Sequence, residues 1–241
     1  MKNTETDSMK KMIALSAVAV VLLSSCAEHI NGNGVIEERT HEVKAFDQID
    51  IAGTFEIHLF QGKPSLEIIA DENLHEHIKV QNENGELKIS TEGKYLDSDD
   101  LILRISSKSI EEIELAGATE LISKDKIRTE SLEIELAGAS SAELEVNAED
   151  LEIDISGGAE VVLEGKVENL QIDISGAGEI MALDLVSANA DVDVAGAGEI
   201  ELTVKKKLDV SIAGAGEVRY KGDPEISQSI AGAGEIEKIS D

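Results

Sequence analysis

The chain has 241 residues, a length that suits one domain, and carries 50 acidic against 21 basic side chains, for a formal charge of −29. A surface this negative repels nucleic-acid phosphates and anionic headgroups, which argues against nucleic-acid binding. With no Trp, three Phe and two Tyr, the core has to be built from Ile, Leu, Val and Ala, which suits thin stacked layers.

The N-terminal segment has the pattern of an export signal. Two lysines precede an apolar run over residues 13–23, which is too short to span a bilayer comfortably. The run closes with Leu-Ser-Ser directly before Cys26, the only cysteine, and this tetrapeptide resembles a bacterial lipobox. The resemblance implies that residues 1–25 are a lipoprotein signal peptide and that Cys26 is lipidated. Because Ala27 follows the cysteine, the signal resembles those of lipoproteins sorted to the outer membrane. It does not indicate whether the protein lies on the cell surface or on the periplasmic face of that membrane.

Residues 26–34 are predicted to be a flexible tether between the lipid and the folded domain. Between residues 35 and 110 the pattern is loose, although residues 49–57 echo the later repeat with Gly53 as their glycine. The next repeat glycine follows 64 residues later, which leaves room for three turns of the repeat. We expect these turns to be irregular because a terminal repeat needs polar cover on its outer face. Strands are predicted at residues 55–60, 66–70, 78–80, 87–90 and 101–105.

From residue 111 to 241 the chain returns seven times to an apolar-small-Gly-small signature. Apolar and polar residues alternate before each glycine, so Leu151, Ile153 and Ile155 are predicted to face inward. Two short strands per repeat exclude βαβ units, which need about thirty residues. The sequence predicts an all-β fold over residues 35–241, a single-stranded parallel β-helix of the right-handed type with about 18–21 residues per turn. The repeat glycines are Gly117, Gly138, Gly157, Gly176, Gly196, Gly214 and Gly232.

Four motifs occur together in this chain. They are the lipobox, Val43-x-x-Phe46-x-x-Ile49-x-Ile51-x-Gly53 with Gln61-Gly62 soon after, Asn84-Gly85-x-Leu87-x-Ile89, and the repeated Gly-Ala-Gly-Glu. As a set they resemble the head GIN domain family, whose members are labelled auto-transporter adhesins. The resemblance covers residues 35–241 and implies an exported, often lipidated β-helix of Bacteroidetes-type bacteria. It brings no catalytic residues to carry over.

A file of glutamates follows the repeat glycines by three residues. Stacked side chains of this kind lie about 4.8 Å apart, and crowded carboxylates are relieved by a raised pKa or by bound cations. Ca²⁺ is the fitting cation, but solvent screens exposed charges, so we expect weak Ca²⁺ binding at most, with no other cofactor or metal. The candidate cation ladder is Glu160, Glu179, Glu199 and Glu217, and a second acidic file three residues before the glycines is Glu114, Glu135, Asp154, Asp173 and Asp193.

His75 and His77 are spaced to share one strand face, yet no third metal ligand stands near them in the sequence. A polysaccharide-degrading enzyme is the third-ranked hypothesis. Glycosidases use paired carboxylates as catalytic groups. In this chain, however, aromatic residues that could stack on sugars are scarce, and long loops that could form a cleft are missing. No catalytic residue is therefore predicted.

The sequence favours a binding module of the cell envelope, held at the outer membrane by a lipid on Cys26. As an adhesin it would contact an unknown protein or glycan through the acidic face of the turns from Glu160 to Glu217. The alternative is a structural or stress-response lipoprotein that faces the periplasm. The oligomeric state stays open, and exposed strands allow end-to-end or side-by-side association.

Overall fold

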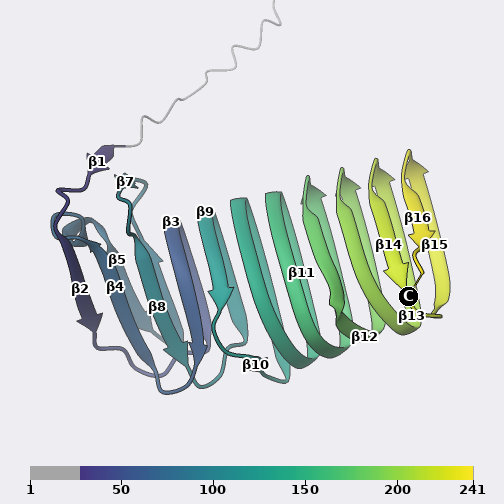
Figure 1. Ribbon diagram of the computed structural model, residues 1–241, viewed down its shortest axis with the longest axis horizontal. Helices are drawn as coiled ribbons and strands as arrows, with labels where there is room; N and C mark the ends of the chain where they lie inside the picture. Colours follow the sequence, from purple (N-terminus) through teal and green to yellow (C-terminus); the bar gives the residue numbers. More distant parts are fainter. Residues whose placement is uncertain (1–27, 241) are drawn as a thin grey trace, which may run out of the picture.

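The computed structural model describes residues 28–240, so the predicted signal peptide and Cys26 lie outside the described residues. Within this range every regular element is a strand, apart from one 3-10 turn, η1, at His75–His77. The strands build an elongated rod, with β1 at one end and β15 and β16 at the other (Figure 1). None of the described residues belongs to a helix long and apolar enough to cross a membrane. The predicted all-β class is confirmed.

The C-terminal two thirds of the rod is a regular stack of parallel strands. Each turn pairs with the next in a register that aligns the repeat glycines, so that Gly176 lies opposite Gly196 and Gly196 opposite Gly214. The longest strand, β11, curves through successive turns of the rod (Figure 1). The predicted parallel pairing and repeat length are confirmed here. The strands are β9 (Glu112–Ser123), β10 (Ile127–Arg128), β11 (Ser131–Gly176), β12 (Glu179–Gly196), β13 (Glu199–Gly214), β14 (Glu217–Lys221), β15 (Glu225–Gly232) and β16 (Glu235–Lys238).

The core is a set of aliphatic files that run along the inside of the stack. Leu151, Ile153 and Ile155 are each no more than 1% exposed, as the alternation predicted. Equivalent positions of the next turns are also buried, and this continuous burial of apolar surface supplies the main stabilisation of the stack. These positions are Leu170, Ile172 and Ile174, then Ala190, Val192 and Val194, then Leu208, Val210 and Ile212.

The repeat glycines are required by backbone contact between turns. Gly176 and Gly196 have φ values of +146° and +148°, a backbone conformation that residues with a Cβ rarely adopt. A Cβ placed on Gly196 would lie 2.2 Å from the carbonyl oxygen of Gly176. Any larger residue would therefore push two turns apart, which confirms the role predicted for the glycines.

The region before the stack differs from the prediction. β3 (Gln48–Gln61) pairs directly with β9, which places Gly53 opposite Gly117. The 63 residues between these two glycines therefore do not form three further turns. They extend the rod on the other edge of β3, where β6 and β8 pair with it in parallel. The strands of this excursion are β4 (Ser65–Asp71), β5 (Lys79–Glu83), β6 (Glu86–Ser90), β7 (Tyr95–Asp97) and β8 (Ile102–Ser107).

Several strands of this region are antiparallel, so the large sheet is mixed. β4 runs antiparallel to both β8 and β2 (Ile36–His41). β5 and β6 form an antiparallel hairpin around Asn84 and Gly85, whose φ values are +55° and +91°. Two consecutive residues with positive φ make a tight two-residue turn, and such a turn joins antiparallel strands. The predicted run of parallel turns over residues 35–110 is therefore correct only for β6 and β8, which pair in parallel with β3.

The described part of the predicted tether is docked onto the domain. β1 (His29–Asn31) pairs in parallel with β7. Asp71, which is 3% exposed, accepts hydrogen bonds from the backbone N–H of Gly34 and from the hydroxyl of Ser98, both at 2.5 Å. A flexible tether over residues 26–34 is therefore not what the structure shows from residue 28 onward.

Candidate functional site

A shallow groove of about 480 Å³ crosses β11, β12 and β13 on the outside of the rod. Its floor includes Leu151, Leu170 and Ala190, whose side chains belong to the core. Two files of polar side chains line it, one seven and one five residues before the repeat glycines. Because equivalent positions stack, each file repeats once per turn, at the strand spacing of about 4.8 Å.

The first file is a ladder of hydrogen-bonded side chains that ends in a lysine. Asn169 donates from Nδ2 to Oδ1 of Asp150 at 2.8 Å. Asn189 donates in the same way to Oδ1 of Asn169 at 2.9 Å. Lys207 follows in the next turn and forms an ion pair with Asp209. Each amide carries two N–H donors and one acceptor, more than the ladder uses, so the file can also bind a ligand.

The second file concentrates negative charge in the groove. Burial raises the pKa of Glu152 above its ordinary value, and the neighbouring Glu133 adds to this rise. Burial likewise raises the pKa of Asp191, reinforced by Asp193 and Asp209. The hydrogen bond from Lys207 lowers the pKa of Asp209. Net acidic character at this site favours hydroxyl-rich or basic partners over anionic ones.

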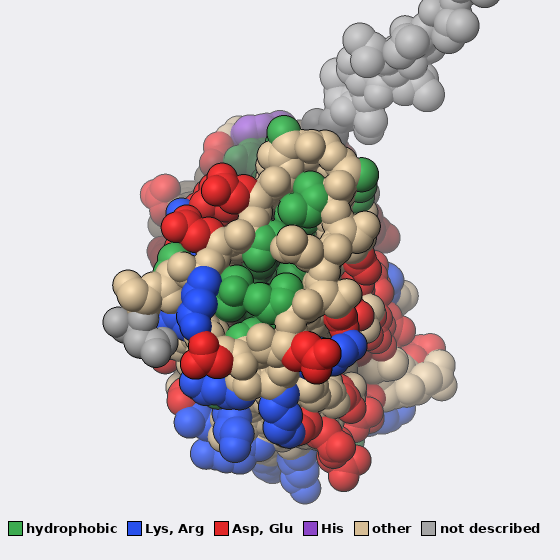
Figure 2. All heavy atoms as spheres, turned by 90° about the vertical axis from the view of Figure 1, so that its right-hand side faces the viewer, with side chains coloured by type: hydrophobic (Ala, Val, Ile, Leu, Met, Phe, Trp, Pro, Cys, Tyr) green, Lys and Arg blue, Asp and Glu red, His purple; other side chains and the backbone are tan. Residues whose placement is uncertain are grey.

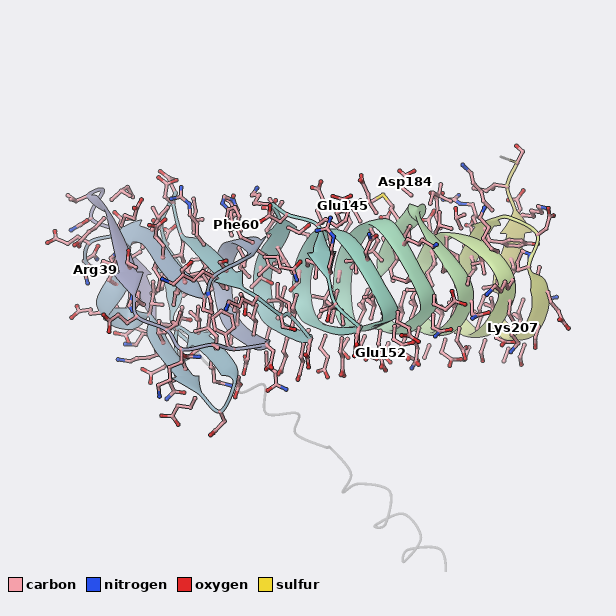
Figure 3. The ribbon with its side chains drawn as sticks, turned by 90° about the horizontal axis from the view of Figure 1, so that it is seen from below. Arg39, Phe60, Glu145, Glu152, Asp184 and Lys207 are labelled. Atoms are coloured by element: carbon pink, nitrogen blue, oxygen red, sulfur yellow. The ribbon has the colours of Figure 1, made fainter. Side chains whose placement is uncertain are left out.

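The glutamates predicted as a cation ladder do form one file. Glu160 lies opposite Glu179, Glu179 opposite Glu199, and Glu199 opposite Glu217. They follow the glycine bend, whereas the groove residues precede it. Figure 3 shows Glu152 and Lys207 along one side of the rod, with Glu145 and Asp184, which follow the bends, along the opposite side.

The C-terminal end of this glutamate file is neutralised by the protein itself. Arg219 contacts Glu199 at 2.5 Å, Glu201 at 2.7 Å and Glu217 at 3.3 Å. Across residues 28–240 no group of three or more His, Cys, Asp or Glu side chains is arranged to hold a metal ion. The guanidinium thus takes the place that a cation would fill at Glu199 and Glu217.

The sequence predicted carboxylates alone as binding residues and did not predict the groove. The predicted acidic file three residues before the glycines does not line the groove. Burial and the adjacent Asp173 raise the pKa of its member Asp154. The asparagines, however, bear no charge, and their hydrogen bonds exist only once successive turns stack. A repeat of Asp or Asn seven residues before the glycine, at Asp150, Asn169 and Asn189, was the signal that would have found them.

The two histidines lie in η1 rather than on a strand face. His75 is 7% exposed, and its Nε2 lies 3.0 Å from the carbonyl oxygen of Glu37. His77 places Nδ1 3.2 Å from Nζ of Lys94. Both rings therefore make contacts that hold the N-terminal region together.

Comparison with known proteins identifies relatives of this fold. A crystal structure named a putative lipid binding protein from Parabacteroides distasonis is 29% identical, with a TM-score of 0.73, and covers 88% of this chain and 100% of its own. One named a putative adhesin from Bacteroides fragilis is 25% identical, with a TM-score of 0.82 and coverage of 87% and 100%. A third, named a putative adhesin from Parabacteroides merdae, shares the fold at 24% identity, a TM-score of 0.67 and coverage of 89% and 100%.

No functionally curated protein matches the chain. Residues 45–224 match the family model described as "Putative auto-transporter adhesin, head GIN domain". The names of the family and of the similar structures describe adhesion or lipid binding, and none of them describes an enzyme. The match covers most of the chain and agrees with the motifs in the sequence. The chain therefore belongs to the head GIN domain family.

Proposed function

We propose that the chain is a cell-envelope lipoprotein, anchored through Cys26, that binds an extended protein or glycan partner along the polar groove without catalysing a reaction. The regular turns then act as a single-stranded parallel β-helix that presents this groove. The observation that carries the proposal is the ladder of Asp150, Asn169 and Asn189, which repeats hydrogen-bonding groups once per turn.

The repeat of the groove supports an extended partner. Polar groups that recur at about 4.8 Å along the rod match a chain-like ligand better than a compact one, because each turn offers the same contact again. Burial, and after it the neighbouring carboxylates, raise the pKa of Glu152 and of Asp191, and these carboxylates together repel an anionic chain. A neutral, hydroxyl-rich glycan or a basic protein segment fits this chemistry.

The position of the anchor supports an outward-reaching module. Cys26 precedes the first described residue by two positions, and β1 lies at one end of the rod (Figure 1). A lipid at Cys26 would hold the rod by that end and leave the groove clear of the membrane. The adhesin description of the family agrees with an envelope location.

Binding to an oligosaccharide array, with neutral, amino-sugar and sialylated members, tests this function. We expect neutral or amino sugars to bind and the Asn169→Ala/Asn189→Ala variant to lose about tenfold in affinity, since two hydrogen-bonding groups are removed. The matched control is Glu179→Ala, on the other file, which should bind as the parent does. Loss of binding in the control would instead return the contact surface to the Glu160–Glu217 file.

Labelling of intact and permeabilised cells with an antibody, with Cys26→Ala as the unlipidated control, tests the location. Labelling of intact cells is expected for an adhesin. If the antibody labels only permeabilised cells and no oligosaccharide on the array binds, the results would favour the periplasmic structural alternative.

A further inference from the structure

The C-terminal end of the rod is open. Within the described residues, β15 pairs on one edge with β13, and β16 pairs on one edge with β14. Ile226 and Ile230 are 39% and 41% exposed, although the residues opposite them in β13 are buried. Figure 2 looks onto this end and shows apolar side chains of the interior framed by the backbone of the last turn. The last turn therefore presents both an apolar face and a free strand edge.

The free edge of β15 lacks the charges that usually protect an edge strand. Natural edge strands avoid pairing by carrying charged side chains or proline. The edge strand at the opposite end, β2, follows this rule with Glu37, Glu38 and Arg39. Residues 226–231 of β15 carry no charge, and Ser227 stands where the preceding turn has Asp209. This edge is suited to pairing with another strand.

The sequence of β15 reads the same in both directions around Gln228. It is Ile226-Ser227-Gln228-Ser229-Ile230. In an antiparallel pair centred on Gln228, Ile226 would face the partner's Ile230, and Ser227 the partner's Ser229. Every residue that points inward in one copy would then point inward in the other, because the side-chain period of a strand is two.

We propose that a second copy of this chain covers the open end, in a tail-to-tail dimer whose β15 strands pair antiparallel in a register centred on Gln228. A two-fold interface requires one patch to complement itself, which the palindromic, uncharged residues 226–230 of β15 do. A head-to-tail contact would instead set β15 against the charged β2 and would continue into an open filament. β16 carries Glu235, Glu237 and Lys238, so the pairing is assigned to β15.

The dimer has a consequence that rests on the proposed anchor at Cys26. The two anchored ends would lie at opposite tips of a doubled rod, because β1 and β15 are at opposite ends of each copy (Figure 1). Two molecules held upright on facing surfaces would thus meet through their tails and link those surfaces. The kind of partner is a second copy of this chain on an opposing surface.

Light scattering of the full chain with Cys26→Ser, over a dilution series, tests the dimer. We expect a dimer that dissociates on dilution, and a monomer for Ser227→Asp/Ser229→Asp, which places two pairs of acids face to face while leaving the core unchanged. Ile230→Lys should also be monomeric. Both variants should melt within a few degrees of the parent at dilutions where all are monomers. The matched control is Ile36→Lys, at a 46% exposed position on β2, which should stay dimeric.

A parent chain that is monomeric at its highest soluble concentration would overturn the proposal, as would dissociation caused by Ile36→Lys. Groove variants such as Asn169→Ala/Asn189→Ala should dimerise as the parent does, which separates this result from the proposed ligand binding. Beads that carry the chain by its N-terminal end should clump, and those with Ser227→Asp/Ser229→Asp should stay dispersed. Dispersed parent beads would overturn the linking of surfaces.

Cross-linking tests the register. Residues directly opposite in an antiparallel pair have Cα atoms about 4.5–5.5 Å apart, within the span of a disulfide. In a Cys26→Ser background, a mixture of Ser227→Cys and Ser229→Cys chains should form a disulfide-linked dimer on oxidation. Either variant alone should cross-link poorly, and equal cross-linking of each alone would contradict pairing centred on Gln228.

Discussion

The two ends of the rod are built from similar strands but differ in strand direction and in the charge of their edge strands. Over residues 28–107 tight turns fold the chain back, strands pair in both directions, and the outer edge β2 is charged. From β9 onward each glycine bend carries the chain into the next turn, every strand pair is parallel, and residues 226–231 of the last turn carry no charge. The turns, rather than the strands, thus determine whether this chain closes an end of the rod or extends the stack.

The N-terminal region acts as the cap that a stack of identical turns needs. Repeat architectures gain stability from contacts between neighbouring turns, so a terminal turn requires cover. Here the excursion between Gly53 and Gly117 supplies it on one side, with Asp71 fixing the first described residues to the domain. The C-terminal end has no such cover among residues 28–240. Its apolar face is therefore accessible to the second copy of the chain proposed above.

The largest expected difference between the two regions is in the free energy of unfolding when one glycine of each is replaced by alanine. Gly196→Ala places a Cβ against the backbone of the preceding turn, so we expect a loss of about 4 kcal/mol or more in the free energy of unfolding. Gly93→Ala also meets a positive φ, +79°, but nothing lies within 4 Å, and the loss should be about 1 kcal/mol. Urea denaturation followed by circular dichroism measures both. Equal losses would show that the stacking contact is not the constraint.

The cap can be loosened without touching the stack. Asp71→Ala leaves the backbone N–H of Gly34 and the hydroxyl of Ser98 without their buried carboxylate acceptor, at a cost of about 1–3 kcal/mol. Hydrogen exchange should rise at residues 28–35 and 95–98, while exchange in β12 stays unchanged. The control is Asp97→Ala, whose side chain is 57% exposed and contacts His29 at 3.4 Å, with little expected effect. Faster exchange throughout the rod after Asp71→Ala would mean that cap and stack unfold together.

Stability should depend on pH through the crowded acids of the stack. Burial raises the pKa of Glu152, Asp154 and Asp191 above the ordinary values of 4.5 for Glu and 3.8 for Asp. Between the ordinary and the raised value the folded chain binds more protons than the unfolded chain, so stability falls as pH rises through this window. Lowering the pH from neutral toward these ordinary values should therefore raise the melting temperature by a few degrees.

The control for this pH effect is Glu152→Gln/Asp191→Asn, which removes two of the three acids and should show a smaller rise. Below the ordinary values the trend should reverse, because hydrogen bonds to Lys207 and Arg39 lower the pKa of Asp209 and Glu37. A melting temperature that climbs steadily from pH 5 to neutral would contradict the assignment.

The smallest expected effect concerns Ca²⁺ and the glutamate file. Arg219→Gln frees Glu199, Glu201 and Glu217 from their guanidinium, so this variant should melt slightly lower than the parent. Millimolar Ca²⁺ should restore part of that loss, since carboxylate oxygens are its usual ligands. The parent, neutralised by Arg219, should respond less. Indifference of both proteins to Ca²⁺ in thermal melts would remove the cation ladder from consideration.

The sequence by itself determined the regular part of the molecule. Apolar and polar residues alternate at Leu151, Ile153 and Ile155, and the glycines recur at a nearly constant spacing. Equivalent positions of successive turns have the same surroundings, so the same residue types recur in the sequence. The strand class, the inward files and the reason for glycine followed from that periodicity. The file from Glu160 to Glu217 followed as well.

Only the tertiary structure decided where the repeat ends and what its surface offers. That Gly53 lies opposite Gly117 depends on long-range pairing across an excursion without periodicity, and no local pattern encodes such pairing. The groove likewise required turns to be stacked before Asn169 and Asn189 could bond to one another. Local periodicity determines the path of one turn, whereas register and closure arise from contacts between residues far apart in the chain.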